Sequence, residues 1–281
     1  MSESKLNDQF QGEQARDLGL RGKTAIVTGA SQGIGLEIAR ALHAEGVTVM
    51  MVAQSTGKLR EAARSVMSAE GADAPSEAIP LVADLTLRAE IERVVVESIK
   101  RLGHVDILVN NAARAHSGNF FKMSVDDLES VWQVKGLGYV RLVRMLAPHM
   151  IERKSGSIIN VIGSTARVPT SDFIVGSMVN AALVNFTRGI SRELAQAGVR
   201  INSISPGWTL TERQEKSIAL QAAARNLTFD QVEREEARGI PLRRLVRMSE
   251  IAALALLLAS DVFPSVTGED IVVDGGAVPA I

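Results

Sequence analysis

Short apolar runs and longer stretches of helical periodicity alternate along most of the chain. Candidate strands, most of them apolar, occur at residues 24–28, 47–53, 78–83, 107–110, 157–162, 200–205 and 270–273. Between them, apolar residues recur with helical spacing at residues 33–45, 58–70, 87–102, 124–153, 179–196 and 249–259. Because apolar strands separated by helices are typical of a parallel sheet covered on both faces, the pattern predicts an α/β fold with a doubly wound, seven-stranded parallel sheet.

Two segments depart from this alternation. Residues 1–20 are polar and contain no apolar stretch of signal-peptide length, which predicts an arm that frays or binds a partner. Residues 211–239 are rich in Ala, Arg, Glu and Gln and predict a helical insertion over the carboxyl edge of the sheet, as a lid or pocket wall. A solvated surface helix is the alternative there. Since no linker or repeat interrupts residues 21–281, we expect them to form one domain.

Composition narrows the class of protein by exclusion. The 31 basic and 32 acidic residues give a formal net charge of -1, which provides no electrostatic basis for binding nucleic acid or an anionic membrane. The chain has no cysteine, so disulfides and thiolate chemistry are excluded, and no metal-ligand spacing is present. The longest clean apolar run, residues 251–259, is too short to cross a bilayer. We therefore expect a soluble cytoplasmic protein without a metal site.

A glycine-rich turn follows the first predicted strand. It reads Thr28-Gly-Ala-Ser-Gln-Gly-Ile-Gly35 and leads into a predicted helix. Gly29 and Gly33 can take backbone angles closed to other residues, and Gly35 lets the helix approach the strand closely. The start of such a helix offers free N–H groups and a positive dipole end to a pyrophosphate, so the turn predicts a dinucleotide site. A tight turn that binds no ligand is the alternative.

Further motifs follow in a fixed order along the chain. They are Asp84-Leu85, Asp-Ile-Leu-Val-Asn-Asn-Ala-Ala at 106–113, Ser-Pro-Gly-Trp at 205–208 followed by Thr211, Pro-Leu-Arg-Arg at 241–244, and residues 266–276 ending in Asp-Gly-Gly. Together with the glycine turn they resemble the short-chain dehydrogenase/reductase family over about residues 22–276. The resemblance implies a single Rossmann-type domain that takes NAD or NADP. It assigns cofactor contacts to Gly29, Ser31, Gln32, Gly33, Ile34, Gly35, Gln54, Asp84, Leu85, Asn111, Ala112, Pro206, Gly207 and Thr211.

The sequence leaves the choice between NAD and NADP open. A carboxylate at the end of the second strand selects the ribose hydroxyls of NAD, whereas an arginine there or in the glycine turn favours the phosphate of NADP. Here the strand ends in Gln54 and Ser55, and the turn contains Gln32. These side chains can hydrogen-bond to either form or serve as ordinary loop residues, and a turn that binds neither also remains open.

The residues that the resemblance makes catalytic are replaced. The family uses a tyrosine whose pKa is lowered by a lysine four residues later; alignment on residues 181–188 places Gly176 and Asn180 at these positions. Lys135 falls at the position of the family's helix asparagine, and Gly163 or Ser164 at that of its serine. The chain's one tyrosine, Tyr139, lies elsewhere. The usual mechanism is therefore excluded by composition.

Two side chains are weak candidates for replacement acid/base groups. Lys135 can have its pKa lowered if it is desolvated in a pocket, although it can equally snorkel or fill the vacated space. His116 follows the strand at 107–110 and can act as a general base, although a loop histidine without an identified partner usually has no such role. Three polar residues can line the same pocket: Ser164, Asp172 and Ser177.

Three functions remain in view from the sequence. The first is a non-catalytic subunit of a hetero-oligomeric NAD(P)-dependent dehydrogenase, paired with an intact homologue. The alternative is an active NAD(P)-dependent oxidoreductase or lyase that uses non-standard residues such as Lys135 and His116. A dinucleotide sensor is the third. The resemblance implies a homo- or heterotetramer through the helices predicted at 124–153 and 179–196, with a small-molecule ligand as a further partner.

Overall fold

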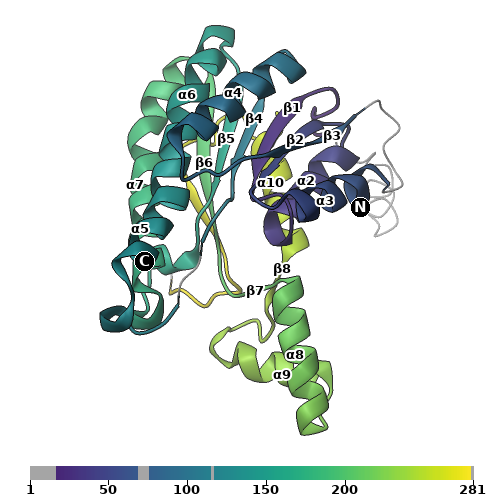
Figure 1. Cartoon of the computed structure of the whole chain (residues 1–281), viewed down its shortest axis with the longest axis vertical. Coiled ribbons are helices and arrows are strands. Elements are labelled where there is room, and N and C mark those ends of the chain that lie inside the picture. Colours follow the sequence, from purple (N-terminus) through teal and green to yellow (C-terminus); the bar gives the residue numbers. More distant parts are fainter. Residues whose placement is uncertain (1–16, 69–75, 115–116, 280–281) are drawn as a thin grey trace, which may run out of the picture.

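A seven-stranded parallel sheet forms the centre of the protein. The computed structural model describes residues 17–68, 76–114 and 117–279. The strands lie in the order β3-β2-β1-β4-β5-β6-β9 (Figure 1). Their bounds are β1 Thr24–Thr28, β2 Thr48–Ala53, β3 Ala78–Val82, β4 Ile107–Asn110, β5 Gly156–Val161, β6 Val199–Pro206 and β9 Asp270–Val273. The predicted α/β fold is confirmed, and the strand order reverses between β1 and β4, where such sheets open a crevice beyond their carboxyl ends.

Helices cover both faces of the sheet. The helices α2 Gly33–Ala44, α3 Thr56–Met67 and α10 Met248–Ala259 lie on one face, and α4 Arg88–Leu102, α6 Gly138–Arg153 and α7 Ile174–Gln196 on the other (Figure 1). Each layer buries its own apolar cluster against the sheet, so β1 and β2 are apolar on both sides. This double burial explains why these strands are nearly continuous apolar runs in the sequence. β6 differs, because it buries Asn202, Ser203 and Ser205.

The helix expected over 124–153 forms from Val125 to Arg153, but it is not regular throughout. The chain forms α5 Val125–Val131, then a π-helical segment η2 Trp132–Leu137, and then α6. A Cβ at Gly136 would lie 2.8 Å from the Trp132 ring, so the wide turn depends on glycine at that position. Such π segments often lie at functional sites and are invisible to a search for regular helical spacing.

The insertion after β6 builds a small helical unit. A two-residue strand β7 Thr209–Leu210 pairs with β8 Val246–Arg247, and between them lie α8 Glu212–Arg225, α9 Phe229–Glu236 and the short helix η5 Ala237–Gly239. Figure 1 shows α8 and α9 projecting away from the sheet. The unit, residues 209–247, is called the lid below. It buries its own apolar cluster, with members Leu210, Ile218, Ala222, Val232, Ala237, Ile240 and Leu245.

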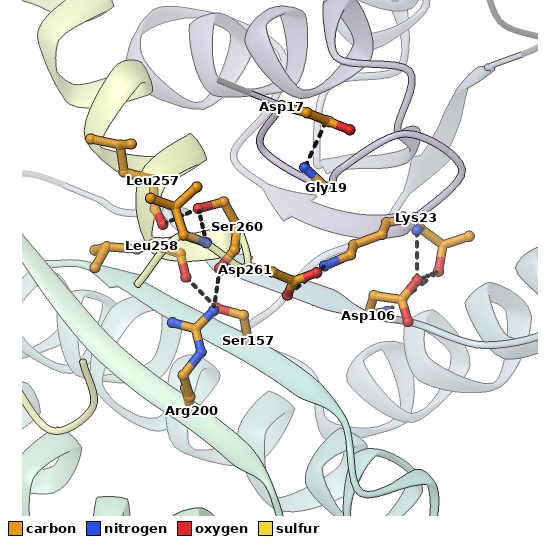
Figure 2. A network of polar contacts seen from close by, with 12 residues as sticks. Asp17, Gly19, Lys23, Asp106, Ser157, Arg200, Leu257, Leu258, Ser260 and Asp261 are labelled. Atoms are coloured by element: carbon orange, nitrogen blue, oxygen red, sulfur yellow. Dashed lines mark hydrogen bonds and ion pairs between the residues drawn. The ribbon is translucent and has the colours of Figure 1, made fainter. Parts of the chain in front are cut away.

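The amino-terminal edge of the sheet is tied together by polar contacts. Figure 2 shows Lys23 ion-paired with Asp261 at 2.9 Å and Asp106 accepting hydrogen bonds from the start of β1. On the neighbouring strands, Ser157 donates to the Leu258 carbonyl. Since these are the N-terminal ends of parallel strands, the network lies at the edge of the sheet opposite the crevice, where it holds neighbouring strands together.

Residues at the end of the expected terminal arm belong to the folded body. Leu20 is 1% exposed within the main apolar cluster, and Leu18 packs against that cluster. The expected arm boundary at residue 20 is therefore too late, because two leucines in a polar segment find partners only in three dimensions. Residues 1–16 lie outside the described residues.

Within the part of the chain that the structure describes, one helical segment, Ser171–Gln196, is long and apolar enough to cross a bilayer by length and composition. It contains α7, whose inner face packs against β6 and the segment after β5. The segment is thus a covering helix of the sheet, and its apolar residues are explained by that packing.

Candidate functional site

A groove of about 850 Å³ opens at the carboxyl edge of the sheet, where the strand order reverses. We call it the glycine-turn groove. Its walls come from the ends of β1, β2, β3 and β4, together with the start of α8. The lining residues are Gly29, Ser31, Gln32, Gly33, Leu36, Ala53, Gln54, Ser55, Lys58, Ala83, Asp84, Leu85, Asn111, Ala112, Ala113, Arg114, Val134, Thr211, Glu212 and Lys216.

The glycine turn forms the floor of this groove. Gly29 and Gly33 have φ values of +67° and +62°, in the region that favours glycine. A Cβ at Gly35 would lie 2.4 Å from the Gly29 carbonyl oxygen and from Asn111 Nδ2, so no larger residue fits between helix and strand. The backbone therefore has the angles and the close approach that the sequence pattern predicted.

Hydrogen bonds hold the turn against the neighbouring strand. Thr28 Oγ1 accepts hydrogen bonds from the backbone N–H of Asn111 at 2.9 Å and of Ala112 at 3.0 Å. Asn111 Nδ2 in turn donates to the Thr28 carbonyl at 3.1 Å. These bonds join the ends of β1 and β4, so the groove is shaped before any ligand enters.

A lid carboxylate reaches the start of α2. The N-cap residue Gln32 makes no side-chain capping bond, and the first turn of α2 contains no acidic residue. Instead Glu212, the first residue of α8, accepts a hydrogen bond from Gly33 N at an N–O distance of 3.4 Å. A negative group thus lies where the helix N-terminus favours an anion.

Polar and cationic side chains gather at the outer end of the groove. Asp84 accepts hydrogen bonds from Thr86 Oγ1 at 2.7 Å and from Gln54 Nε2 at 2.7 Å, and Arg114 donates to Gln54 Oε1 at 3.3 Å. Burial by itself raises the pKa of the Asp84 carboxyl, but the Thr86 hydrogen bonds, the Arg114 charge and the Gln54 hydrogen bond together lower it. Asp84 is therefore an anion that orients Gln54.

Two cations in this region were missed by the sequence analysis. Lys58 Nζ donates to Gln32 Oε1 at 3.3 Å, and Arg114 contacts Gln54, so both flank the ends of β1 and β2. Lys58 is one helical turn past Gln54, and Arg114 directly follows the Asn-Asn-Ala-Ala motif. That spacing is a usable signal in the sequence, although the rule for a cofactor selector considers only the strand end and the glycine turn.

The structure brings most of the expected cofactor residues together. Ten of the residues assigned above line the groove. Ile34, Gly35, Pro206 and Gly207 do not. Gly35 acts beneath the floor, Pro206 pairs with Val273 at the end of β6, and a Cβ at Gly207 would lie 2.6 Å from Asp274 Cβ. These positions shape the surrounding backbone.

A second region lies between the end of β5 and the start of α7. We call the space around Gly163, Gly176 and Asn180 the β5–α7 corner. A Cβ at Gly176 would lie 2.2 Å from the Phe173 ring, and one at Gly163 would lie 2.7 Å from Asn180 Nδ2. Asn180 is buried and donates to Thr165 Oγ1 at 2.9 Å. The corner is therefore filled by an aromatic ring and an amide.

Lys135 is buried behind this corner. It lies in the π segment η2, is 8% exposed, and donates a hydrogen bond to the carbonyl of Ile162, next to Gly163. Burial lowers the pKa of its ammonium from 10.5 to about 7. Lys135 does not snorkel to solvent, so that alternative is wrong.

Tyr139 is also buried and donates to the Val161 carbonyl at 3.1 Å, and burial raises the pKa of its phenol well above 10.0. Such a phenol serves as packing and as a hydrogen-bond donor.

The other expected pocket residues are dispersed. Ser177 is buried and donates to the Phe173 carbonyl at 3.0 Å, whereas Asp172 is exposed. Ser164 begins the short helix η3 Ser164–Ala166 and is half-buried. None of the three lines the glycine-turn groove, because they belong to three different elements: η3, the short helix η4 Ser171–Phe173 and the first turn of α7. His116 lies outside the described residues.

Comparison with known proteins defines the class. A family model described as Enoyl-(Acyl carrier protein) reductase matches residues 29–278. The chain belongs to this family, the short-chain dehydrogenases/reductases.

Individual relatives match along nearly their whole length. The 2,3-dihydro-2,3-dihydroxybenzoate dehydrogenase of Bacillus subtilis (strain 168) is 34% identical over 92% of this chain and 97% of its own. Oxidoreductase UcpA of Escherichia coli (strain K12) is 34% identical over 92% of this chain and 95% of its own. Among solved structures, L-sorbose reductase from Gluconobacter frateurii, complexed with NADPH and L-sorbose, has a TM-score of 0.87 at 28% identity, covering 95% of this chain and 100% of that one.

Proposed function

We propose that this chain is an NAD(P)-dependent oxidoreductase of the short-chain dehydrogenase/reductase family that works without the family's tyrosine–lysine pair. The observation that carries the proposal is the preformed glycine-turn groove, whose volume and polar floor suit a dinucleotide. The relatives named as a dehydrogenase, an oxidoreductase and a reductase support the reaction class. The proposed substrate is a small-molecule alcohol or its carbonyl partner.

The chain's residues fit a dinucleotide at three points. The pyrophosphate would lie over the backbone amides at Gly33. A Cβ at Gly29 would lie 2.9 Å from Ala112 Cα, so glycine there lets the turn pack against the end of β4. Asp84 and Gln54 would hold the adenosine end. Thr211 lines the opposite wall, at the start of the lid. When bound, the nicotinamide would supply or accept a hydride, while the residues named here would hold the pyrophosphate and the adenosine end.

The cations at the outer end of the groove support NADPH as the preferred form. A 2′-phosphate adds negative charge beside the end of β2, where Lys58 and Arg114 flank Gln32 and Gln54. No carboxylate ends β2 to select the free ribose hydroxyls. Both cations donate their hydrogen bonds to neutral amide oxygens. Each can therefore exchange this ion–dipole contact for a stronger ion pair with a phosphate.

Lys135 is the proposed acid/base group. General acids work best when their pKa lies near the ambient pH, and its pKa of about 7 meets that condition. Its ammonium donates to the Ile162 carbonyl, next to Gly163, and it is buried outside the groove lining. The proposed role therefore requires the β5–α7 corner to open toward the substrate. We expect kcat/KM of the purified chain to titrate with an apparent pKa near 7, and this step to vanish in Lys135→Gln.

One observation favours a second candidate, a non-catalytic subunit that pairs with an intact homologue. The Phe173 ring occupies the space at Gly176, and Asn180 brings no charge to the corner. The outer surface of the α4–α7 layer also exposes apolar side chains that suit a partner, namely Leu87, Val96, Val125, Leu137 and Met178. In this role the chain would form a tetramer and would shape the partner's site.

A single set of measurements separates these functions. The chain is purified alone and with a homologue that has the tyrosine–lysine pair, and turnover of alcohols and ketones is followed by NADPH absorbance. Turnover by the lone chain that depends on Lys135 supports the oxidoreductase. A stable mixed oligomer, active only through the homologue's tyrosine, supports the subunit. Tight NADPH binding with neither result indicates a sensor. Absence of binding contradicts the oxidoreductase and the sensor, and leaves only the subunit.

A further inference from the structure

We infer that Glu212 is a latch: its carboxylate occupies the phosphate-binding position of the glycine turn, and cofactor binding must displace it together with the start of the lid. The inference rests on the proposed dinucleotide function and adds a regulated lid to it. It starts from one contact, the hydrogen bond from Gly33 N to Glu212 Oε1.

The glycine turn has no anion of its own. No acidic residue lies in the first turn of α2, and its N-cap Gln32 makes no capping bond. Glu212 comes from 179 residues further along the chain and meets the amide that a pyrophosphate would use. Both the carboxylate and a phosphate are drawn to this position by the same free N–H groups and dipole, so they compete.

The contact is weak enough to be exchanged. Its N–O distance of 3.4 Å is longer than that of an ordinary N–H to O hydrogen bond. A dinucleotide brings two phosphates to the same amides, so it outcompetes one loosely held carboxylate. A carboxylate that stayed in place would repel the phosphates across the groove.

The lid can respond as a unit. Ile218 and Ala222 anchor α8 in the lid's own apolar cluster, which is separate from the clusters of the sheet. Hydrogen bonds from Gln214 and Gln221 to Glu236 tie α8 to α9. Release of Glu212 therefore frees a preassembled helical pair.

Lys216 provides a cation close to the same position. It lies one turn after Glu212 on α8, on the same face of the helix, and lines the same groove. Once the Glu212 carboxylate has left the turn, this cation remains on the groove wall to attract the phosphates.

An ordinary explanation for Glu212 is that acidic residues stabilise the start of their own helix, here α8. Glu215 supplies the matched control, because it lies in the same first turn but is exposed and does not line the groove. Glu212→Gln and Glu215→Gln remove the same charge from the same helix end. Only the first removes it from the glycine turn.

The test measures NADPH affinity by fluorescence titration of the full chain and its two variants. We expect Glu212→Gln to bind NADPH about fivefold more tightly than the unaltered chain, and Glu215→Gln to stay within about twofold. Equal or weaker binding by Glu212→Gln overturns the latch while leaving dinucleotide binding intact.

Hydrogen exchange without any ligand tests the latch independently. Amides of residues 29–36 should exchange faster in Glu212→Gln than in Glu215→Gln, because the lid contact that protects them is lost. Unchanged exchange overturns the latch. If neither the unaltered chain nor Glu212→Gln binds NADPH or NADH, the proposed function fails, and the exchange result still decides whether Glu212 holds the turn.

Discussion

The glycine-turn groove and the β5–α7 corner lie along the same carboxyl edge of one sheet, yet they are built in opposite ways. The groove is open because its floor consists of glycines and backbone amides, held in place by Thr28 and Asn111. The corner is closed, because Phe173 and Asn180 fill the spaces beside its two glycines. Holding a dinucleotide depends on backbone geometry, whereas acid/base chemistry depends on a few side chains, so one can persist while the other is rebuilt.

The largest effect is expected from a substitution that distorts the floor of the groove. Gly35→Ala places a Cβ 2.4 Å from the Gly29 carbonyl oxygen, and overpacking of this kind costs about 3 kcal/mol in unfolding free energy. We expect NADPH affinity to fall at least tenfold, roughly the loss of one or two contacts. Urea unfolding and fluorescence titration measure the two effects. Gly189→Ala, exposed and without close neighbours in α7, serves as the control and should be neutral or slightly stabilising.

The buried ammonium of Lys135 should make the free energy of unfolding depend on pH. The folded-state pKa of Lys135 is about 7, below its unfolded value of 10.5, so between these values the unfolded chain holds a proton that the folded chain lacks. Stability should rise by about 2 to 3 kcal/mol between pH 6 and pH 9 through this group.

In the Lys135→Met variant, the free energy of unfolding measured with urea should not show this rise between pH 6 and pH 9. Lys122→Met, which alters an exposed lysine in the short helix η1 Phe120–Lys122, should keep it. A rise of the same size in the Lys135 variant would mean that other groups produce it.

The filled corner predicts coupling between Gly176 and Phe173. Gly176→Ala should cost about 2 kcal/mol, because its Cβ would lie 2.2 Å from the Phe173 ring. Combined with Phe173→Leu, the added cost should shrink by about 1 kcal/mol, measured as a double-mutant cycle of urea unfolding. Strict additivity of the two substitutions would show that the ring does not occupy this space in solution.

At the groove's outer end, the cations should set cofactor preference. Lys58→Met and Arg114→Met should each weaken NADPH binding about tenfold, the value of one charge-assisted contact, with NADH binding changed less than about twofold. Parallel fluorescence titrations with NADPH and NADH measure the ratio of the two affinities for each variant. Arg60→Met, also on α3 but exposed and outside the groove, is the matched control. Equal losses for NADH would argue against a phosphate subsite.

The smallest expected effect concerns the single tyrosine. Tyr139→Phe removes the hydrogen bond to the Val161 carbonyl and should lower the free energy of unfolding by about 1 kcal/mol. NADPH affinity and any turnover should remain unchanged, because Tyr139 is buried away from the groove. A large loss of turnover would give this phenol a chemical role.

The sequence alone determined the sheet and the glycine turn, because both are local. The central strands β1 and β2 are nearly continuous apolar runs, and the positive φ at Gly29 and Gly33 follows from the short motif that contains them. The absence of a phenol at residue 176 was equally a matter of composition.

Only the tertiary structure decided what occupies each site. The packing of Phe173 over Gly176, the burial of Lys135 in a π turn and the reach of Glu212 to Gly33 join residues whose contacts no periodicity encodes. The pKa of Lys135 likewise depends on the desolvation that surrounding elements impose. Local backbone preferences are written in short motifs, whereas the environment of a side chain is set by every element that folds around it.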